Sequence, residues 1–441
     1  MDASSLRELG QDLIAEGRWE KALGVFAEAV RRQPADHRSR LYAAKCYEKL
    51  GEPERAVLVA HAAAEGLLRR DYLLSAIMAC KLALALAPNE KRVKGTLRRI
   101  YARAARATQG RAKVPPPLPP SELYEDQVKQ DIMGLSGSQL MDRAIEVLAN
   151  PDESGSGADP GARPPLPLFA ELDEEAFIAL VELMALRQCA PNEIISKEGE
   201  GGDTITVMVA GKAEVTRLVD AKPKTLAFLA GGSIFGELSL LTGAPPSVTV
   251  TAVVDTEVFE IKREHLNTIA RDFPTVTPAL TQFAQTRMAK NLVATSPLFA
   301  QIPEKQRGEI LARFRFKPLQ AGEKAITEGE HTPGLFMVLA GEVVVQKEDP
   351  NGGLVSLSIL REGDLAGEIS LLTGLRATAT VVATRKTATA FMPRSEFDVL
   401  IEAEPAVKAF LQELSDKRLK RIGEALRPAE IIDADELVVE S

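Results

Sequence analysis

One stretch of this chain occurs twice. Residues 236–243 read GELSLLTG and residues 367–374 read GEISLLTG, so the two copies lie 131 positions apart. The similarity continues outside the octapeptide, because PLFA at 167–170 returns at 297–300. Self-similarity that extends over more than a hundred residues indicates a duplicated domain. Each copy therefore serves as a control for the other, and a position at which they differ is informative.

The length and composition are those of an ordinary soluble chain. The 441 residues suit two to four domains of about 100–200 residues each. The hydrophobic fraction is 45% and the charged fraction 26%, both usual for globular proteins. The net charge of -8 argues against nucleic acid as the main partner, so we expect no DNA binding. No apolar run approaches the ~18 residues of a membrane span, so we expect none.

Several classes of site are excluded by the residue types present. Cys46, Cys80 and Cys189 are scattered without a pairing pattern, which fits a reducing compartment and predicts a cytoplasmic protein. The four histidines are not clustered either, so we expect no metal site and no cofactor. The chain has no Walker loop, no kinase motif set and no Ser/His/Asp grouping. We therefore predict that it is not an enzyme.

The first 110 residues form an all-helical domain by their pattern. Apolar residues recur at spacings of three and four between residues 4 and 107. The segment 19–34 places Ala22, Phe26 and Ala29 on one face and stops at Pro34. This alternation of small and large residues resembles tetratricopeptide (TPR) repeats, whose helix pairs stack into a concave solenoid. The alternative is a plain helical bundle.

Two segments of linker composition follow the helical domain. Residues 114–120 read VPPPLPP and residues 151–165 are rich in glycine, proline and serine, which predicts a stiff and a flexible linker. Between them, residues 138–150 have the pattern of one amphipathic helix. We therefore predict a linker over 111–165 that tethers the helical domain without fusing it rigidly to the rest.

The remainder of the chain changes to short, alternating, β-branched runs such as TITVMVAG at 204–211. Many short strands separated by turn signals predict a β-roll or jelly-roll barrel, here with flanking helices. The duplication predicts two such domains, which we call domain A (166–295) and domain B (296–426). An acidic tail (427–441) follows them. The fold class is thus multidomain α+β, with a TPR-like all-α solenoid followed by two barrels.

The barrels resemble the cyclic-nucleotide-binding domain. The matching features are the Gly202–Asp203 turn, a glycine after a hydrophobic strand (Gly211, Gly341) and the repeated Gly-Glu segment. The resemblance covers both copies, about 260 residues. It identifies the chain as a tandem cyclic-nucleotide-binding (cupin-like β-roll) protein of bacterial type with TPR-like repeats. It implies cAMP, cGMP or a related nucleotide as ligand, without a true cofactor.

A Gly-Glu segment that opens a short helix suits an anionic nucleotide. Backbone N–H groups face the anion, and the glutamate accepts a hydrogen bond from a ribose hydroxyl. In the family an arginine a few residues later binds the cyclic phosphate. The candidate residues of cassette A are Gly236, Glu237, Leu238, Ser239, Pro246, Ser247 and Val248. Those of cassette B are Gly367, Glu368, Ile369, Ser370, Arg376, Ala377 and Thr378.

Both copies depart from the family at the arginine. Pro246 occupies its position in cassette A, and Ala377 occupies it in cassette B, where Arg376 lies one residue early. A shift of one residue at the start of a strand points a side chain the other way. Loss of a charge-assisted partner of a buried phosphate costs about 2–5 kcal/mol, or about 30- to several-thousand-fold in affinity. We therefore expect no useful nucleotide binding in domain A, and binding in domain B only if the loop brings Arg376 into place.

Two functions fit these features. In the first, favoured by the lost arginines, the helical groove binds a partner protein and the two barrels are a degenerate scaffold. In the second, domain B is a ligand-gated signalling regulator whose C-terminal helices repack over the nucleotide. An analogue of the kinase-regulatory branch ranks last, since the linker lacks an Arg-Arg-x-Ser segment. Homo-oligomerisation is left open.

A basic patch marks the end of the helical domain. Two interpretations are open, a solvated capping helix and a dock for an acidic partner such as the chain's own tail with Glu430, Asp433, Asp435 and Glu436. The candidate partner-binding residues are Lys91, Arg92, Arg98, Arg99 and Arg103.

Overall fold

The computed structural model describes residues 2–106, 132–150, 169, 172–219, 222–283, 286, 296–348 and 353–425. These residues belong to two compact units. The first holds Met1–Ile195, Thr204–Phe235 and Val250–Phe283, and the second holds Ser196–Asp203, Gly236–Thr249 and Ala284–Ser441. Cassette A, which we predicted within domain A, is thus grouped with domain B. The acidic tail and most of the linker segment lie outside the described residues.

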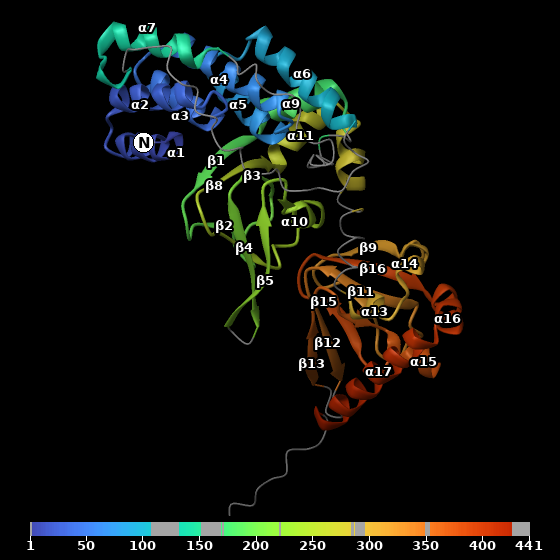
Figure 1. The fold of residues 1–441 in the computed structure, drawn as a ribbon. Coiled ribbons are helices and arrows are strands. Elements are labelled where there is room, and N and C mark those ends of the chain that lie inside the picture. Colours follow the sequence, from blue (N-terminus) through green and yellow to red (C-terminus); the bar gives the residue numbers. More distant parts are fainter. Residues whose placement is uncertain are drawn as a thin grey trace, which may run out of the picture. The chain divides into compact units, whose positions relative to one another are not determined.

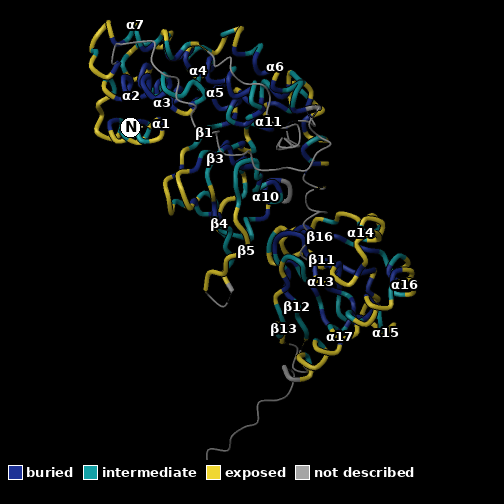
Figure 2. The backbone as a smooth tube through the Cα atoms, in the orientation of Figure 1, coloured by how far each residue is buried: buried dark blue, intermediate teal, exposed yellow. Residues whose placement is uncertain are grey.

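The N-terminal region is helical, as its apolar spacing predicts (Figure 1). Its helices pack in sequence order, and their facing positions are buried (Figure 2). A Cβ on Gly10 would lie 2.4 Å from the ring of Phe26, so the missing side chain admits the ring and lets the two helices approach. Assignment to the TPR family stays a prediction. The helices are α1 (Ala3–Ala15), α2 (Trp19–Arg32), α3 (His37–Lys49), α4 (Pro53–Arg69), α5 (Leu73–Leu86) and α6 (Lys91–Arg106).

The helix that we predicted inside the linker belongs to this helical region instead. Helix α7 (Gly137–Leu148) packs against α2 and α4 through Leu140, Ala144 and Leu148, all buried. The fully buried Arg40 donates hydrogen bonds to the carbonyls of Leu148 (3.2 Å) and Asn150 (2.9 Å). The bond to Leu148 satisfies a carbonyl that the end of α7 leaves without a partner. The linker composition on either side hid this packing from sequence reasoning.

The helical region also packs on the first barrel, which differs from the predicted loose tether. Tyr101 of α6 donates a hydrogen bond to the carbonyl of Leu172 (2.7 Å), just before α9 (Glu174–Leu183). The Tyr101 ring contacts the ring of Phe177, with centroids 5.6 Å apart. Lys94 forms an ion pair of 2.7 Å with Glu182 at the other end of α9. Aromatic packing and ion pairs together make α6 and α9 one packed layer.

Each barrel consists of two four-stranded antiparallel sheets with the same topology (Figure 1). The sheets of the first barrel have the strand orders β1-β8-β3-β6 and β2-β7-β4-β5. Those of the second have the orders β9-β16-β11-β14 and β10-β15-β12-β13, which is the same arrangement eight strands later.

The first-barrel strands are β1 (Ala185–Cys189), β2 (Ile194–Ser196), β3 (Thr204–Ala210), β4 (Lys212–Val219), β5 (Lys222–Ala230), β6 (Ile234–Phe235), β7 (Thr249–Ala252) and β8 (Thr256–Lys262). Helix α10 (Glu237–Thr242) follows β6 and α11 (Arg263–Asp272) follows β8.

The second-barrel strands are β9 (Arg315–Leu319), β10 (Lys324–Ile326), β11 (Gly334–Ala340), β12 (Val343–Glu348), β13 (Leu354–Leu360), β14 (Leu365–Ala366), β15 (Thr380–Ala383) and β16 (Thr387–Pro393). Its helices are α13 (Pro297–Ala300), α14 (Glu304–Leu311), α15 (Glu368–Thr373), α16 (Arg394–Ala403) and α17 (Pro405–Ala425).

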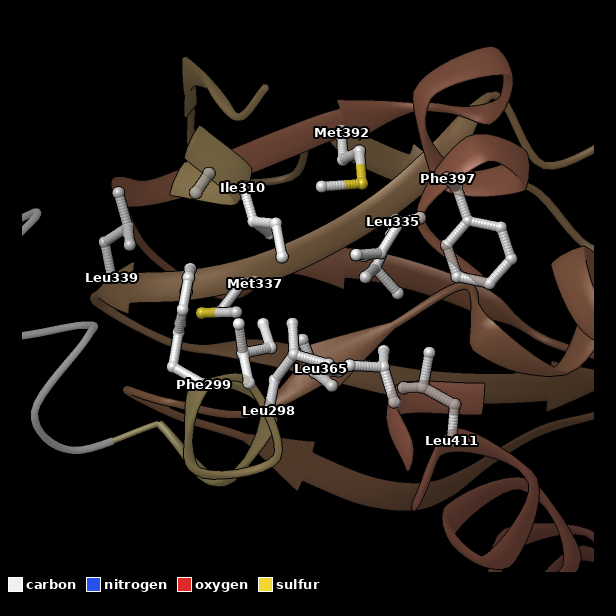
Figure 3. Packing of buried hydrophobic residues seen from close by; sticks show 14 of the residues in the cluster. Leu298, Phe299, Ile310, Leu335, Met337, Leu339, Leu365, Met392, Phe397 and Leu411 are labelled. Atoms are coloured by element: carbon white, nitrogen blue, oxygen red, sulfur yellow. The ribbon is translucent and has the colours of Figure 1, made fainter. Parts of the chain in front are cut away.

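The core of the second barrel extends to the C-terminal helix. Figure 3 shows Met337 of β11, Leu365 of β14 and Leu411 of α17 in one cluster of buried side chains. Val407 and Leu411 of α17 are fully buried there, and Leu414 packs against the same cluster. The N-terminal half of α17 is therefore anchored in the hydrophobic core, and this anchor sets the direction in which its C-terminal half continues.

Candidate functional site

Domain B contains a cavity of about 350 Å³ at the repeated cassette. Strands β10, β12, β13 and β15 form its walls, α15 lies at one end, and the C-terminal half of α17 covers it. Its floor is apolar, with Val345, Leu360 and Val381 among the lining residues. A concave apolar site with a few convergent polar groups is the usual form of a small-molecule pocket. The polar lining residues are Thr332, Ser358, Asp364, Glu368, Ser370, Thr378, Lys417, Arg418 and Arg421.

The conformation of Gly367 directs Glu368 into this cavity. Gly367 has φ +100°, a left-handed conformation that side chains rarely adopt, and a Cβ there would lie 2.8 Å from the carbonyl oxygen of Gly334. The chain therefore turns sharply before α15, and Glu368 at its first position is 1% exposed. Ser370, two residues later, is 3% exposed. The repeated glycine is thus required by backbone geometry, and it places a buried carboxylate in the cavity wall.

Glu368 forms an ion pair with a residue that sequence analysis missed. Arg418 of α17 donates from Nη1 to Glu368 Oε1 (2.8 Å) and to the carbonyl oxygen of Leu365 (2.6 Å). The Glu368 side chain is 2% exposed and that of Arg418 is 21% exposed. A buried carboxylate without a partner is costly, and this pairing removes that cost. The glutamate of cassette B is therefore compensated by the C-terminal helix and not by a residue of the barrel.

Thr332 is a second cavity residue that sequence analysis missed. It is 2% exposed, and its Oγ1 has no hydrogen-bond partner within the described part of the chain. A buried hydroxyl without a partner costs about 1–3 kcal/mol, which a ligand atom or a water molecule in the cavity would relieve. Its counterpart in the first copy is Gly202 of the Gly-Asp turn that matches the family. The difference between threonine and glycine at this position of the two copies was the sequence signal that could have identified Thr332.

The two candidates for the phosphate-binding position occupy different places. Ala377 is 6% exposed and lines the cavity, together with Thr378. Arg376 is exposed, lies outside the cavity lining, and donates from Nη1 to the carbonyl oxygen of Gly329 (2.9 Å). The structure thus brings Gly367, Glu368, Ile369, Ser370, Ala377 and Thr378 of the predicted set together around one cavity and places Arg376 apart from them.

Cassette A has the same backbone. Gly236 is left-handed (φ +88°), and Glu237 and Ser239 of α10 are 4% and 6% exposed. The amide of Gly199 donates to the carbonyl oxygen of Pro246 (2.9 Å), just as the amide of Gly329 donates to that of Ala377 (2.9 Å). Pro246 and Ala377 are therefore structural counterparts. Leu238, Ser247 and Val248 of the predicted set are half-buried.

The predicted partner-binding residues on α6 are partly engaged within the chain. Arg103 forms an ion pair of 2.7 Å with Asp71, and Arg98 pairs with Glu174 (3.1 Å). Arg99 pairs with Glu65, whose pKa falls to about 2 because hydrogen bonds from His61, Thr96 and Arg99 outweigh the opposing effect of burial. Lys91 and Arg92 remain exposed. The patch is therefore smaller than the sequence suggests.

Comparison with known proteins agrees with the duplicated site. Residues 186–273 and 316–404 each match the family model of the cyclic nucleotide-binding domain. The chain therefore contains two cyclic nucleotide-binding domains in tandem, as the repeated cassette predicts. None of its described helices is both long and apolar enough to cross a membrane.

Curated relatives are regulatory subunits of cAMP-dependent protein kinase. That of Blastocladiella emersonii is 27% identical over 236 residues, which is 53% of this chain and 56% of the relative. That of Yarrowia lipolytica is 27% identical over 238 residues, 53% of this chain and 58% of the relative. The chain thus spans little more than half the length of either relative. The prediction that it is not an enzyme agrees with these regulatory proteins. Both are eukaryotic, so the predicted bacterial type is not supported.

Solved structures are matched at low overall similarity. The regulatory domain of Toxoplasma gondii PKA with cAMP is 23% identical, with a TM-score of 0.28 over 57% of this chain and 92% of that one. A regulatory subunit of a cAMP-independent protein kinase A from Trypanosoma brucei is 18% identical, with a TM-score of 0.30 over 59% and 92%. At TM-scores this low, neither structure supports a conclusion about the function of this chain.

Proposed function

We propose that this chain is a non-enzymatic regulatory protein in which domain B binds a nucleotide and the other domains present surfaces to a partner. The cavity under α17 is the observation that carries this proposal. Its volume of about 350 Å³ suits a ligand of nucleotide size, and its wall holds a buried glutamate, Glu368. The proposal therefore gives domain B the sensing role.

The C-terminal helix supplies a route from ligand to partner. Helix α17 is anchored in the core by Val407 and Leu411, while Leu414, Arg418 and Ile422 lie over the cavity. A ligand that contacts these residues binds better when the helix is docked, and it therefore shifts the helix toward that position. The ligand would then alter whatever surface α17 presents, which is the minimum that a regulatory protein needs.

Domain A and the helical region are the scaffolding half in this proposal. Pro246 supplies no charge where the family has its arginine, so cassette A keeps the backbone turn without that arginine. The helical region offers a groove of about 270 Å³ against the first barrel, lined by Tyr42, Lys45, Leu82 and Leu186 among others. A partner protein bound by TPR-like helices fits this arrangement. The relatives are named for a kinase that they regulate, so a kinase in the cytoplasm is the first partner to test.

Titration of the full chain with cyclic AMP and cyclic GMP tests the proposal. We expect saturable binding in calorimetry and a melting temperature that rises with ligand concentration, because a ligand of the folded state stabilises it by mass action. A Thr332→Val variant keeps the side-chain shape and removes the hydroxyl, so it should change ligand affinity. Thr384→Val is the matched control outside the cavity lining. Absence of heat and of any thermal shift with both nucleotides would leave only the scaffold function.

A further inference from the structure

The cavity of domain B, called cavity B below, is lined by charges of opposite sign from two sources. Among its described lining residues, the barrel contributes the carboxylates Asp364 and Glu368, and α17 contributes the cations Lys417, Arg418 and Arg421. Without the docked helix the wall would be acidic and would repel an anion. With the helix docked the cations outnumber the carboxylates, and attraction replaces repulsion.

Arg418 has N–H donors that its hydrogen bonds to the described residues do not use. A guanidinium carries five N–H groups in a rigid fork, two on each Nη and one on Nε. Both hydrogen bonds of Arg418 to the described residues use Nη1, one to Glu368 and one to Leu365. Nη2 and Nε therefore remain available within a partly buried site. Arg418 can hold Glu368 in place and bind an anionic oxygen at the same time.

Arg421 and Lys417 flank Arg418 on the cavity side of the helix. Arg421 forms no ion pair with another described residue. Lys417 is 69% exposed on its side chain and already pairs with Glu413 (2.6 Å), so its effect on the cavity is reduced. We therefore expect Arg418 to contribute most to the positive charge of the cavity, Arg421 less and Lys417 least.

We propose that Arg418, supported by Arg421, is the anion-binding residue of cavity B and replaces the arginine that the barrel lacks at Ala377. The ligand class is a phosphate-bearing nucleoside, whose hydroxyl groups contact Glu368 and Thr332. The inference rests on the nucleotide-binding function proposed for domain B. It also makes anion binding dependent on the docked helix, because all the positive charge among the described lining residues comes from α17.

The sequence repeat extends to the positions of Arg418 and Arg421. The offset of 131 residues that relates Gly236 to Gly367 also relates Arg287 to Arg418 and Lys290 to Arg421. Arg287 and Lys290 lie outside the residues whose side chains the structure describes, so this relation concerns the sequence alone. Both copies therefore keep two basic residues at matching positions although both lack the arginine of the barrel.

Calorimetric titration of the full chain with cyclic AMP, cyclic GMP and uncharged adenosine tests the assignment. We expect Arg418→Gln to weaken both cyclic nucleotides by about 30-fold or more, the range for loss of a charged partner in a buried site. Adenosine should change by less than about threefold, because it has no charge to lose. Arg418→Lys should retain part of the affinity, and Arg421→Gln should cost less than Arg418→Gln. Lys420→Gln is the matched control, since Lys420 is exposed on the same helix outside the cavity lining.

Hydrogen exchange across residues 414–422 supplies a second measurement. Cyclic nucleotide should slow exchange there in the wild-type chain and in Lys420→Gln, and it should have little effect in Arg418→Gln. The assignment is overturned if Arg418→Gln binds cyclic nucleotide as tightly as wild type, or if it weakens adenosine equally. Binding of adenosine without binding of cyclic nucleotides also overturns it and leaves a nucleoside-binding domain B. If none of the three probes binds, the proposed function falls as well.

Discussion

The two barrels share the backbone of their cassettes and differ at the position of the family's arginine, which is Pro246 in one copy and Ala377 in the other. Gly236 and Gly367 have the same left-handed turn, and the carbonyls of Pro246 and Ala377 accept equivalent hydrogen bonds. In domain B the buried glutamate of this shared turn is paired with Arg418 of the terminal helix. The repeated Gly-Glu segment is therefore a requirement of the backbone turn in both copies, while the partner of Glu368 in domain B lies outside the repeated octapeptide.

Placing an arginine at the family position should have a large effect on the affinity for cyclic nucleotides. In Ala377→Arg the new side chain starts from a buried position in the cavity wall. We expect affinity for cyclic AMP and cyclic GMP to rise by about 30-fold or more, which corresponds to at least ~2 kcal/mol. The matched variant Pro246→Arg should gain less, because it also releases a backbone position that proline restricts. Calorimetry on the full chain measures both. Equal gains in the two copies would contradict the difference between them.

The turn glycines should behave alike in the two copies. Gly211 and Gly341 have φ of +99° and +98°, and a Cβ would lie 2.5 Å and 2.6 Å from the Oγ1 of Thr256 and Thr387. We expect Gly211→Ala and Gly341→Ala each to lower the free energy of unfolding by about 2–4 kcal/mol, from strain and overlap together. Urea denaturation measures the loss.

Gly322→Ala separates strain from overlap in that experiment. Gly322 is also left-handed (φ +83°), but a Cβ added there would have no neighbouring atom within 4 Å, so its cost should be only the ~1–2 kcal/mol of conformational strain. If Gly341→Ala costs no more than Gly322→Ala, the close approach to Thr387 has no energetic consequence. A large difference between Gly211→Ala and Gly341→Ala would show that the barrels are less alike than their topology indicates.

Much of this arrangement could be predicted from the sequence, and the exceptions have physical reasons. The duplication, the strands and the helical start follow from periodicity, and the glycines before Glu237 and Glu368 follow from repetition. The docking of α7 was missed because residues that flank it have linker composition. Arg418 was missed because a basic residue on an amphipathic helix resembles a solvated one until the anchoring of Leu411 and Leu414 shows which way it faces. Long-range contacts of this kind are not encoded in local spacing.

Acid should destabilise the helices α6 and α9, which pack against the first barrel, more than it destabilises the core of the second barrel. Glu65 links α4 to α6, which packs on α9, and its pKa is lowered to about 2 although burial alone would raise it. A depressed carboxyl pKa contributes stability above the ordinary value of 4.5, and this is lost as pH falls from about 4.5 toward 2. The loss is at most about 3 kcal/mol.

Hydrogen exchange at successive pH values tests this expectation. Protection of α6 and α9 should fall before protection of the second barrel core. Glu65→Gln should be less stable than wild type at neutral pH and should show a flatter dependence between about pH 5 and 3, with Glu54→Gln as an exposed control on the same helix, α4. Simultaneous loss of protection in both barrels would show that acid acts through carboxylates other than Glu65.

The smallest expected effect concerns the residue after the turn glycine, which is Lys212 in one copy and Glu342 in the other. Glu342 accepts a hydrogen bond from Arg361 Nε (3.0 Å) and another from Thr384. Burial works to raise its pKa, but the bonds from Arg361 and Thr384 outweigh it and the pKa is lowered. Lys212 instead lies 4.3 Å from the centroid of the Phe228 ring, an attraction that involves no carboxyl group.

Acid should therefore weaken this turn in domain B and not in domain A. Since the pKa of Glu342 is depressed, its contribution is present above the usual carboxyl range and is lost as pH falls through the folded-state value. Arg361 is 58% exposed, so solvent screening limits the effect to about 1 kcal/mol or less. In urea denaturation, Glu342→Gln should reduce the stability of domain B at about pH 7 and make little difference at about pH 3, while Lys212→Met should cost the same at both. An equal pH dependence in the two variants would contradict this assignment, because the cation–π contact of Lys212 involves no group that titrates between about pH 3 and 7.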